Sequence, residues 1–283
     1  MQKIDAHQHF WHYRPNIHGW INDHMAVLKQ DFLPTNLAPL LQAHECVGCV
    51  AVQASQTLAE TDWLLSLAEK NDFILGVVGW VDLQDVQLTD TLKNLVSNPK
   101  LKGVRHIIQD EPDDAFMLRP HFVRGVNQLA AHQLTYDLLI YERHLPTALS
   151  FIDQVPDVPI VVDHIAKPKI SKHELQPWKK NITSLARNSA AYCKISGMVT
   201  EANWQNWKYE NLLPYLDTVV EAFGTSRLMI GSDWPVCLLA AEYAEVIEIV
   251  KHYFSRFSAD EKQRIFYQNA VDFYQLSVPS PNV

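Results

Sequence analysis

The sequence predicts an α/β protein of one domain, a (β/α)8 TIM barrel. Eight short apolar segments, rich in β-branched residues, alternate along the chain with segments whose apolar residues recur at helical spacing. The length of 283 residues is close to the roughly 250 residues typical of this architecture. An open doubly wound sheet is the competing arrangement, but no glycine-rich phosphate loop follows the first strand.

The predicted strands are nearly continuous in apolar residues, as expected for strands buried on both faces. They cover residues 3–11, 47–54, 74–82, 101–107, 134–141, 158–164, 191–197 and 227–233. The predicted helices cover residues 37–43, 59–70, 90–97, 120–132, 145–154, 178–188, 212–224, 241–253 and 259–267. No linker interrupts the pattern, so we expect the barrel to span residues 1–276, followed by a disordered tail at 277–283.

A long aromatic segment, residues 11–32, separates the first strand from the first helix. Pro15 and Gly19 interrupt regular structure there. Loops longer than about 12 residues in compact domains are often lids or binding loops. The aromatic side chains would therefore either contact a substrate or plug the mouth of the barrel.

Composition excludes several classes of function. A net charge of −8 and a pI near 5.9 argue against nucleic-acid or acidic-membrane binding. No apolar run is long enough to span a membrane, and the chain enters its first strand without a signal segment, so we expect a cytoplasmic protein. The 4 cysteines do not form a disulfide framework. Cys46 and Cys49 would face opposite sides of a strand, and we expect them to be buried apolar residues.

The first strand ends in a His-x-His pair, His7 and His9. Because side chains alternate along a strand, both imidazoles project to the same face. Two such imidazoles can bind a divalent ion or exchange protons with a substrate. The pair is a weak motif in a chain with 13 histidines, but it stands where a barrel enzyme builds its active site.

The remaining predicted strands also carry polar or aromatic side chains at or near their ends. A buried ionisable group there costs desolvation energy unless it is paired. These side chains are Gln53, Trp80, Asp82, Arg105, His106, Tyr141, His164, Lys167, Lys194, Ser196, Asp233 and Trp234. Lys194 lies within a strand, so its side chain would face either the barrel interior or a helix. Asp233 ends an apolar strand and would face three histidines across the barrel mouth. There it would stay ionised and take a proton from water.

Taken in order, these motifs resemble those of the amidohydrolase superfamily. They are His7-Gln8-His9-Phe10-Trp11, Gly103-Val104-Arg105, Asp163-His164-Ile165-Ala166-Lys167-Pro168, Lys194-Ile195-Ser196-Gly197, Gly231-Ser232-Asp233-Trp234-Pro235 and the C-terminal Asn269-Ala270-Val271-Asp272-Phe273-Tyr274. The resemblance covers essentially the whole chain. It is greatest to the branch that contains sugar lactonases and dicarboxylate lactonases, and it does not indicate one substrate.

The resemblance implies a role for each motif. Asp233 would be the general base that activates water for attack on a lactone carbonyl and later returns the proton to the leaving alkoxide. His7, His9 and His164 would surround that carbonyl and water. Arg105 would bind substrate oxygens or stabilise the oxyanion. The further predicted substrate contacts are Trp80, Trp11, Lys167, Tyr141 and Trp234.

The resemblance leaves two cofactor states open. Either no cofactor is required, or one divalent metal ion, with zinc favoured, is bound by His7, His9, His164 and Asp233. The superfamily usually places a carboxylated lysine or a glutamate at the fourth or fifth strand. Here Arg105 and Tyr141 stand at those strand ends, so we do not expect a binuclear site.

The predicted function is hydrolysis of a small sugar (aldonic acid) lactone, with a small molecule as partner, no nucleic acid, no membrane, and a homodimer as one option. Two alternatives stay open: a metal-dependent decarboxylase of the carboxymuconate-decarboxylase type, and a non-catalytic barrel that binds sugar acids. A neutral lactone is favoured over a dicarboxylate, because Arg105 is the only arginine at the predicted strand ends. The tryptophans at the strand ends suit a sugar ring.

Overall fold

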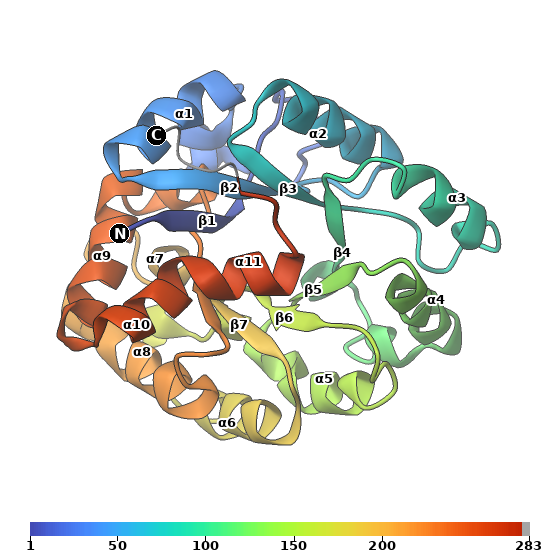
Figure 1. Cartoon of the computed structure of the whole chain (residues 1–283). Helices are drawn as coiled ribbons and strands as arrows, with labels where there is room; N and C mark the ends of the chain where they lie inside the picture. The colour runs from blue at the N-terminus through green and yellow to red at the C-terminus, as the bar shows by residue number, and fades with distance from the viewer. Residues whose placement is uncertain (279–283) are drawn as a thin grey trace.

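Eight parallel strands stand side by side in sequence order, and the helices cover the outside of this ring (Figure 1). The computed structural model describes residues 1–278. The strands are β1 (Lys3–Gln8), β2 (Cys46–Val52), β3 (Ile74–Gly79), β4 (Leu101–Ile107), β5 (Thr135–Leu139), β6 (Ile160–Val162), β7 (Tyr192–Ile195) and β8 (Leu228–Ile230). The predicted (β/α)8 barrel is confirmed, as one domain.

The helices follow the predicted alternation. They are α1 (Pro34–Ala43), α2 (Leu58–Lys70), α3 (Leu88–Leu95), α4 (Pro120–Ala131), α5 (Leu145–Ile152), α6 (Trp178–Asn188), α7 (Met198–Glu201), α8 (Tyr209–Phe223) and α9 (Tyr243–Tyr253). The predicted last helix, 259–267, is divided into α10 (Ala259–Gln263) and a π-helical turn (Arg264–Gln268), and α11 (Asn269–Tyr274) follows it. No helix among residues 1–278 is both long and apolar enough to cross a membrane.

The helix α11 lies across one end of the ring (Figure 1). Its Phe273 and Tyr274 belong to a buried apolar cluster with Ile4, Val50 and Met229 from inside three strands. Because the Tyr274 hydroxyl also donates to Asp137 within the barrel, at 2.8 Å, α11 closes the end of the barrel where the strands begin. The opposite end, where the strands finish, is left for a site. The predicted tail begins at Ser277, and its residues 279–283 lie outside the described part of the chain.

Seven of the eight strands end earlier than predicted, β4 being the exception, and β6, β7 and β8 share a physical reason. The predicted last residues of β6, β7 and β8 were His164, Gly197 and Asp233, and these have φ of 52°, 62° and 58°. A residue in this left-handed region cannot continue a strand. The backbone therefore turns sharply at each of these ends, and the turns carry polar side chains to the barrel mouth.

The barrel closes between β8 and β1, and this seam places two predicted site residues together. Beyond β8, the Asp233 N–H donates to His7 O at 2.9 Å, and the His9 N–H donates to Trp234 O at 2.7 Å. The approach is close enough that a Cβ on Gly231 would lie 2.5 Å from His7 Cβ, so only glycine fits. The seam thus sets Asp233 beside His7 and His9.

Candidate active site

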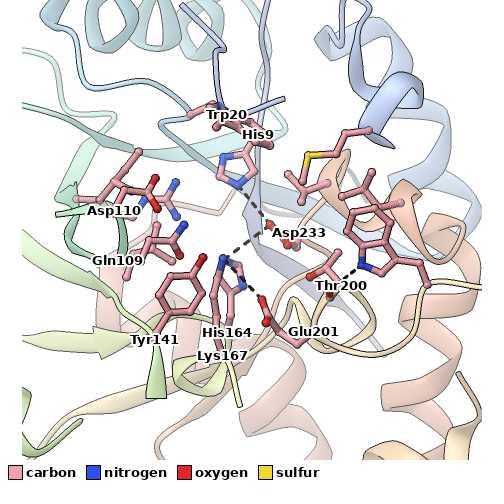
Figure 2. A pocket seen from close by; sticks show the side chains of 18 residues that line it. His9, Trp20, Gln109, Asp110, Tyr141, His164, Lys167, Thr200, Glu201 and Asp233 are labelled. Carbon is pink, nitrogen blue, oxygen red and sulfur yellow. Dashed lines mark hydrogen bonds and ion pairs between the residues drawn. The ribbon is translucent and has the colours of Figure 1, made fainter. Parts of the chain in front are cut away.

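A cavity of about 410 Å³ opens at the end of the barrel where the strands finish (Figure 2). Its wall combines histidines, carboxylates and aromatic rings. The lining residues are His9, Trp20, Met25, Ala54, Arg105, Ile107, Gln109, Asp110, Leu139, Tyr141, His164, Lys167, Thr200, Glu201, Trp204, Asp233, Val236 and Leu239. The volume suits a small molecule.

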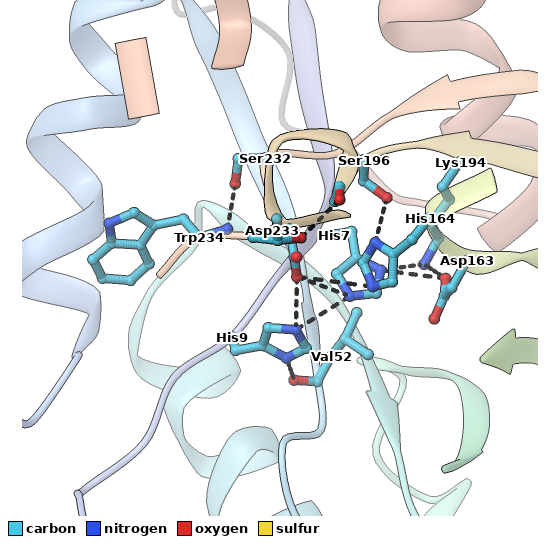
Figure 3. Close-up of polar contacts among 12 residues, drawn as sticks. His7, His9, Val52, Asp163, His164, Lys194, Ser196, Ser232, Asp233 and Trp234 are labelled. Carbon is cyan, nitrogen blue, oxygen red and sulfur yellow. Dashed lines mark hydrogen bonds and ion pairs between the residues drawn. The ribbon is translucent and has the colours of Figure 1, made fainter. Parts of the chain in front are cut away.

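Asp233 stands among three imidazoles at the base of this cavity (Figures 2 and 3). Its Oδ1 lies 3.3 Å from His9 Nε2, 3.8 Å from His164 Nε2 and 3.9 Å from His7 Nε2. His7 lies in β1 and His9 directly after it, while His164 and Asp233 lie in the turns after β6 and β8; all four stand where the sequence predicts strand ends. Their predicted convergence is therefore observed, and their catalytic roles are taken up below.

A left-handed turn presents two side chains to the cavity. Residues His164 to Lys167 all have positive φ, between 46° and 59°. Such a run costs roughly 1–2 kcal/mol per residue and needs support from its surroundings. Trp178 supplies part of this support, since its Nε1 donates to Ile165 O at 2.7 Å. Ser196 Oγ holds the His164 ring at Nδ1, 2.8 Å away. The turn thereby directs both His164 and Lys167 toward the cavity.

A buried network of charges lies beneath the histidines. Arg105 Nη1 donates to Asp163 Oδ2 at 3.0 Å, and its Nη2 donates to the Gln53 carbonyl. Lys194 points into the barrel, where its Nζ lies 2.5 Å from Asp137 Oδ2 and 3.0 Å from Asp163 Oδ1. Of the two directions open to Lys194, the structure thus shows the interior one. The two cations and two anions balance, as burial requires.

The surroundings shift the pKa values of the site. Burial lowers the pKa of His164 to about 4 and that of His7 well below its ordinary value, so both rings are neutral at pH 7. Burial alone would raise the pKa of Asp233, but attraction to the neighbouring His164 holds it well below its ordinary value. Asp233 is therefore an ionised carboxylate at neutral pH.

The mouth of the cavity carries a second group of polar and aromatic residues (Figure 2). Lys167 Nζ lies 3.8 Å from Glu201 Oε1 and 5.7 Å from the centre of the Tyr141 ring. Burial raises the pKa of Glu201. Gln109 Oε1 and Arg105 Nε are buried polar atoms without a hydrogen-bond partner among the described residues. Such atoms leave hydrogen-bonding capacity for a ligand.

Three predicted substrate contacts are not on the cavity wall, which corrects the prediction for Trp11, Trp80 and Trp234. The chain after β1 leaves the strand and pairs Trp11 with Phe32, so the Trp11 ring is buried under the aromatic segment. Trp234 packs edge-on against Phe32, with ring centroids 5.2 Å apart. The Trp80 backbone is held through Thr61 of α2 instead of extending the strand into the mouth. Of the other predicted contacts, Arg105, Lys167 and Tyr141 do line the cavity.

The sequence did not indicate Trp204, Glu201 and Gln109 as cavity residues, although all three line the cavity. Trp20 lies in the aromatic segment that was expected either to contact a substrate or to plug the mouth; its side chain lines the cavity, whereas Trp11 of the same segment is buried. Glu201 ends the short helix α7 and Gln109 lies in a turn after β4, where no periodic pattern shows which way a side chain points.

Two groups of side chains have the composition of a metal site. His7, His164 and Asp233 form one, with His9 adjoining it at 3.2 Å from His7 Nε2. Neighbouring ligand atoms of a tetrahedral zinc ion lie about 3.3 Å apart. The distance between His7 and His9 and the distances from the three rings to Asp233 Oδ1, 3.2 to 3.9 Å, fit one divalent ion. The other group, His7 with Asp137 and Asp163, surrounds the Lys194 ammonium, which already supplies its positive charge.

Comparison with known proteins agrees with this fold. The chain is 40% identical over 289 residues to an L-fucono-1,5-lactonase of Burkholderia multivorans, covering 98% of this chain and 97% of that protein. It is 36% identical to an L-fucono-1,5-lactonase of Burkholderia ambifaria over 285 residues, with the same two coverages. A crystal structure of an amidohydrolase from Burkholderia multivorans with bound zinc matches at a TM-score of 0.95 and 40% identity, covering 98% of this chain and all of that one. The amidohydrolase family model matches residues 4–276, and the chain belongs to the amidohydrolase family.

Proposed function

We propose that this protein hydrolyses a small, neutral sugar lactone. The observation that carries the proposal is a buried carboxylate, Asp233, set among three imidazoles at the base of a cavity of about 410 Å³. The two relatives named L-fucono-1,5-lactonase support the substrate class. A lactone of one sugar ring would fill a cavity of this volume.

In this mechanism Asp233 is the general base. It takes a proton from a water molecule whose oxygen attacks the lactone carbonyl carbon. When the tetrahedral intermediate collapses, the bond from carbonyl carbon to ring oxygen breaks, and Asp233 gives the proton to that oxygen. Because the leaving alkoxide is the stronger base, the low pKa of Asp233 favours this second transfer. The product is an open-chain hydroxy acid, which releases one proton at neutral pH.

The histidines orient the reactants. Ser196 Oγ lies at His164 Nδ1, which leaves His164 Nε2 facing the reacting groups beside Asp233. His9 Nδ1 donates to the Val52 carbonyl at 2.8 Å, and the tautomer with its one hydrogen there presents a lone pair at Nε2. Arg105 adds a fixed positive charge at the wall, suited to the negative charge that develops on the carbonyl oxygen.

One divalent metal ion fits the same residues. The candidate ligands are His7, His9, His164 and Asp233, as their spacing allows. When bound, such an ion would polarise the lactone carbonyl as a Lewis acid. The structure with bound zinc among the similar proteins makes zinc the first ion to try.

The charges of the cavity favour a neutral substrate. Arg105 is paired with Asp163, and Lys167 is paired with Glu201. A lactone with two carboxylates would lose the hydration of both charges on binding, and neither Arg105 nor Lys167 is an unpaired cation that could replace it. Hydroxyl groups, in contrast, suit the unpartnered Gln109 Oε1 and Arg105 Nε. The rings of Trp20, Tyr141 and Trp204 offer faces for the C–H groups of a sugar.

A panel of lactones tests the proposal by proton release in weakly buffered solution, with and without a chelator. The panel contains L-fucono-1,5-lactone, other aldonolactones, and 2-pyrone-4,6-dicarboxylate. Each rate is corrected for spontaneous hydrolysis, which is appreciable for six-membered lactones. We expect the highest kcat/KM for an aldonolactone. A higher kcat/KM for the dicarboxylate would refute the substrate class, and ligand binding without hydrolysis of any lactone would identify a non-catalytic barrel.

A further inference from the structure

The His7 ring lies between two sets of partners (Figure 3). Its Nδ1 is 3.1 Å from Lys194 Nζ and 3.3 Å from Asp163 Oδ1. Its Nε2 is 3.2 Å from His9 Nε2 and 3.3 Å from Arg105 Nη1. Because a fixed cation faces each nitrogen, a third positive charge on the ring is disfavoured. The neutral ring carries one hydrogen, and the partners determine which nitrogen holds it.

One arrangement forms a continuous chain of hydrogen bonds. The Lys194 ammonium donates to His7 Nδ1, and the ring hydrogen on His7 Nε2 donates to His9 Nε2. His9 can accept there because its own hydrogen is on Nδ1, where it donates to the Val52 carbonyl. In this arrangement neither Nε2 has a lone pair free for a cation.

The other arrangement moves the ring hydrogen to His7 Nδ1, which then donates to Asp163 Oδ1. That oxygen is buried and accepts no hydrogen bond from any described residue, although it lies beside the Lys194 ammonium. The Nε2 lone pairs of His7 and His9 now face each other at 3.2 Å, next to the Asp233 carboxylate. Arg105 Nη1, 3.3 Å away, can donate to the His7 Nε2 lone pair, while the lone pairs of His9 Nε2 and Asp233 stay available to a divalent ion.

We propose that Lys194 is a positioning residue that selects the first arrangement and so lowers the affinity of the site for a divalent ion. Both His7 nitrogens are then hydrogen-bonded without metal, and binding an ion requires His7 to pass its hydrogen from Nε2 to Nδ1. Asp163 Oδ1, 3.3 Å from His7 Nδ1, would accept the hydrogen bond from that position. The inference concerns metal binding alone and holds whatever the substrate is.

Histidine tautomers are read directly by NMR of protein labelled with ¹⁵N in its histidines, with His7→Gln used to assign the His7 signals. We expect the Nε2–H form in the metal-free protein and the Nδ1–H form after addition of zinc. A ring already in the Nδ1–H form before zinc is added would overturn the proposal and assign the selection to Arg105 or Asp163.

Zinc affinity, measured by competition with a chromophoric chelator, gives the second readout. Lys194→Met alone would leave Asp137 as a buried charge without its cation. The test variant is therefore the double substitution Lys194→Met and Asp137→Asn, which preserves the charge balance. Asp137→Asn alone, which keeps Lys194, is the matched control. We expect the double variant to bind zinc roughly tenfold more tightly than the control, the usual worth of one charge-assisted hydrogen bond. Its metal-free His7 should show the Nδ1–H form. Equal affinities, or an unchanged tautomer, would contradict the role of Lys194.

Discussion

At the scale of single residues, the sequence shows more about the reacting centre than about the wall around it. His7, His9, His164 and Asp233 stand at the C-terminal ends of predicted strands, and the ends of parallel strands meet in a barrel whatever the loops do. This is why their convergence could be predicted. The cavity wall depends on loops, whose side-chain directions follow from packing that no short pattern records. Trp11 and Trp20 are equally aromatic, yet only Trp20 lines the cavity.

Glu201 illustrates how one missed residue bears on specificity. It is paired with Lys167 at 3.8 Å and lines the cavity. We predict that Glu201→Gln, by freeing the Lys167 charge, lowers the inhibition constant of a carboxylate-bearing lactone about fivefold, as one unit charge near 4 Å in water implies. The inhibition constant of the matching neutral lactone should change much less.

Glu174→Gln is the matched control, because Glu174 pairs with the exposed Lys169 and does not line the cavity. If both variants changed the inhibition constant equally, long-range charge would explain the effect and the pair at the mouth would not.

At the scale of the elements, the C-terminal end of helix α4 lacks the glycine that usually marks such an end. Helix α4 ends in a Schellman motif, in which the Leu134 N–H donates to Leu129 O and the Gln133 N–H donates to Ala130 O, each at 3.1 Å. The residue in the left-handed position, usually glycine, is Gln133, with φ of 57°. The end of α4 was predicted within one residue because the apolar spacing stops there, although the glycine signal is missing.

We predict that Gln133→Gly stabilises the protein by about 0.5–1 kcal/mol, since it removes left-handed strain and costs only some unfolded-state entropy. Gln133 is exposed, so no packing is lost. Urea unfolding measures the change. The neighbouring His132→Gly, at φ of −106°, is the control and should destabilise. Destabilisation by Gln133→Gly would show that the glutamine side chain stabilises the turn.

At the scale of the whole molecule, the alternation of strands and helices was enough to predict the barrel. Strands that are apolar on both faces and helices that are apolar on one face bury these faces together when the helices surround a ring of parallel strands. The bounds of β4 and α6 agree with the prediction. The early ends of β6, β7 and β8 were not predictable, since left-handed turns at His164 and Asp233 are held by distant partners such as Trp178 and the β1 backbone.

The stability of the whole molecule should depend on pH through Glu60. Its carboxylate accepts hydrogen bonds from Ala54 and Ser55, joining α2 to the chain after β2. Burial nevertheless raises the pKa of Glu60 from 4.5 to about 7. An acid with a raised folded-state pKa binds more protons when folded, so its ionisation destabilises the fold as pH rises from 4.5 to 7.

We therefore predict that Glu60→Gln changes the pH dependence of the unfolding free energy. Between pH 4.5 and pH 7.5, the unfolding free energy of the variant should rise by about 3 kcal/mol relative to that of the wild type, whatever the absolute stability of the variant. Urea unfolding at the two pH values measures this difference. The exposed Glu69→Gln on the same helix should show no such gain. If the unfolding free energies of the wild type and Glu60→Gln differed by the same amount at both pH values, Glu60 would not have a raised pKa in the folded protein.

The central claim, that Asp233 activates water at this site, is tested most directly by the turnover of Asp233→Asn on the best aldonolactone. Loss of a positioned general base costs about 10²–10⁴-fold, so we expect kcat to fall at least about a hundredfold. Asp110→Asn, which removes another carboxylate from the cavity wall, should stay within about threefold of wild type. The affinity for the hydroxy-acid product, measured by calorimetry, should change little in either variant. Near-wild-type kcat in Asp233→Asn, with product binding intact, would contradict the account and require another base.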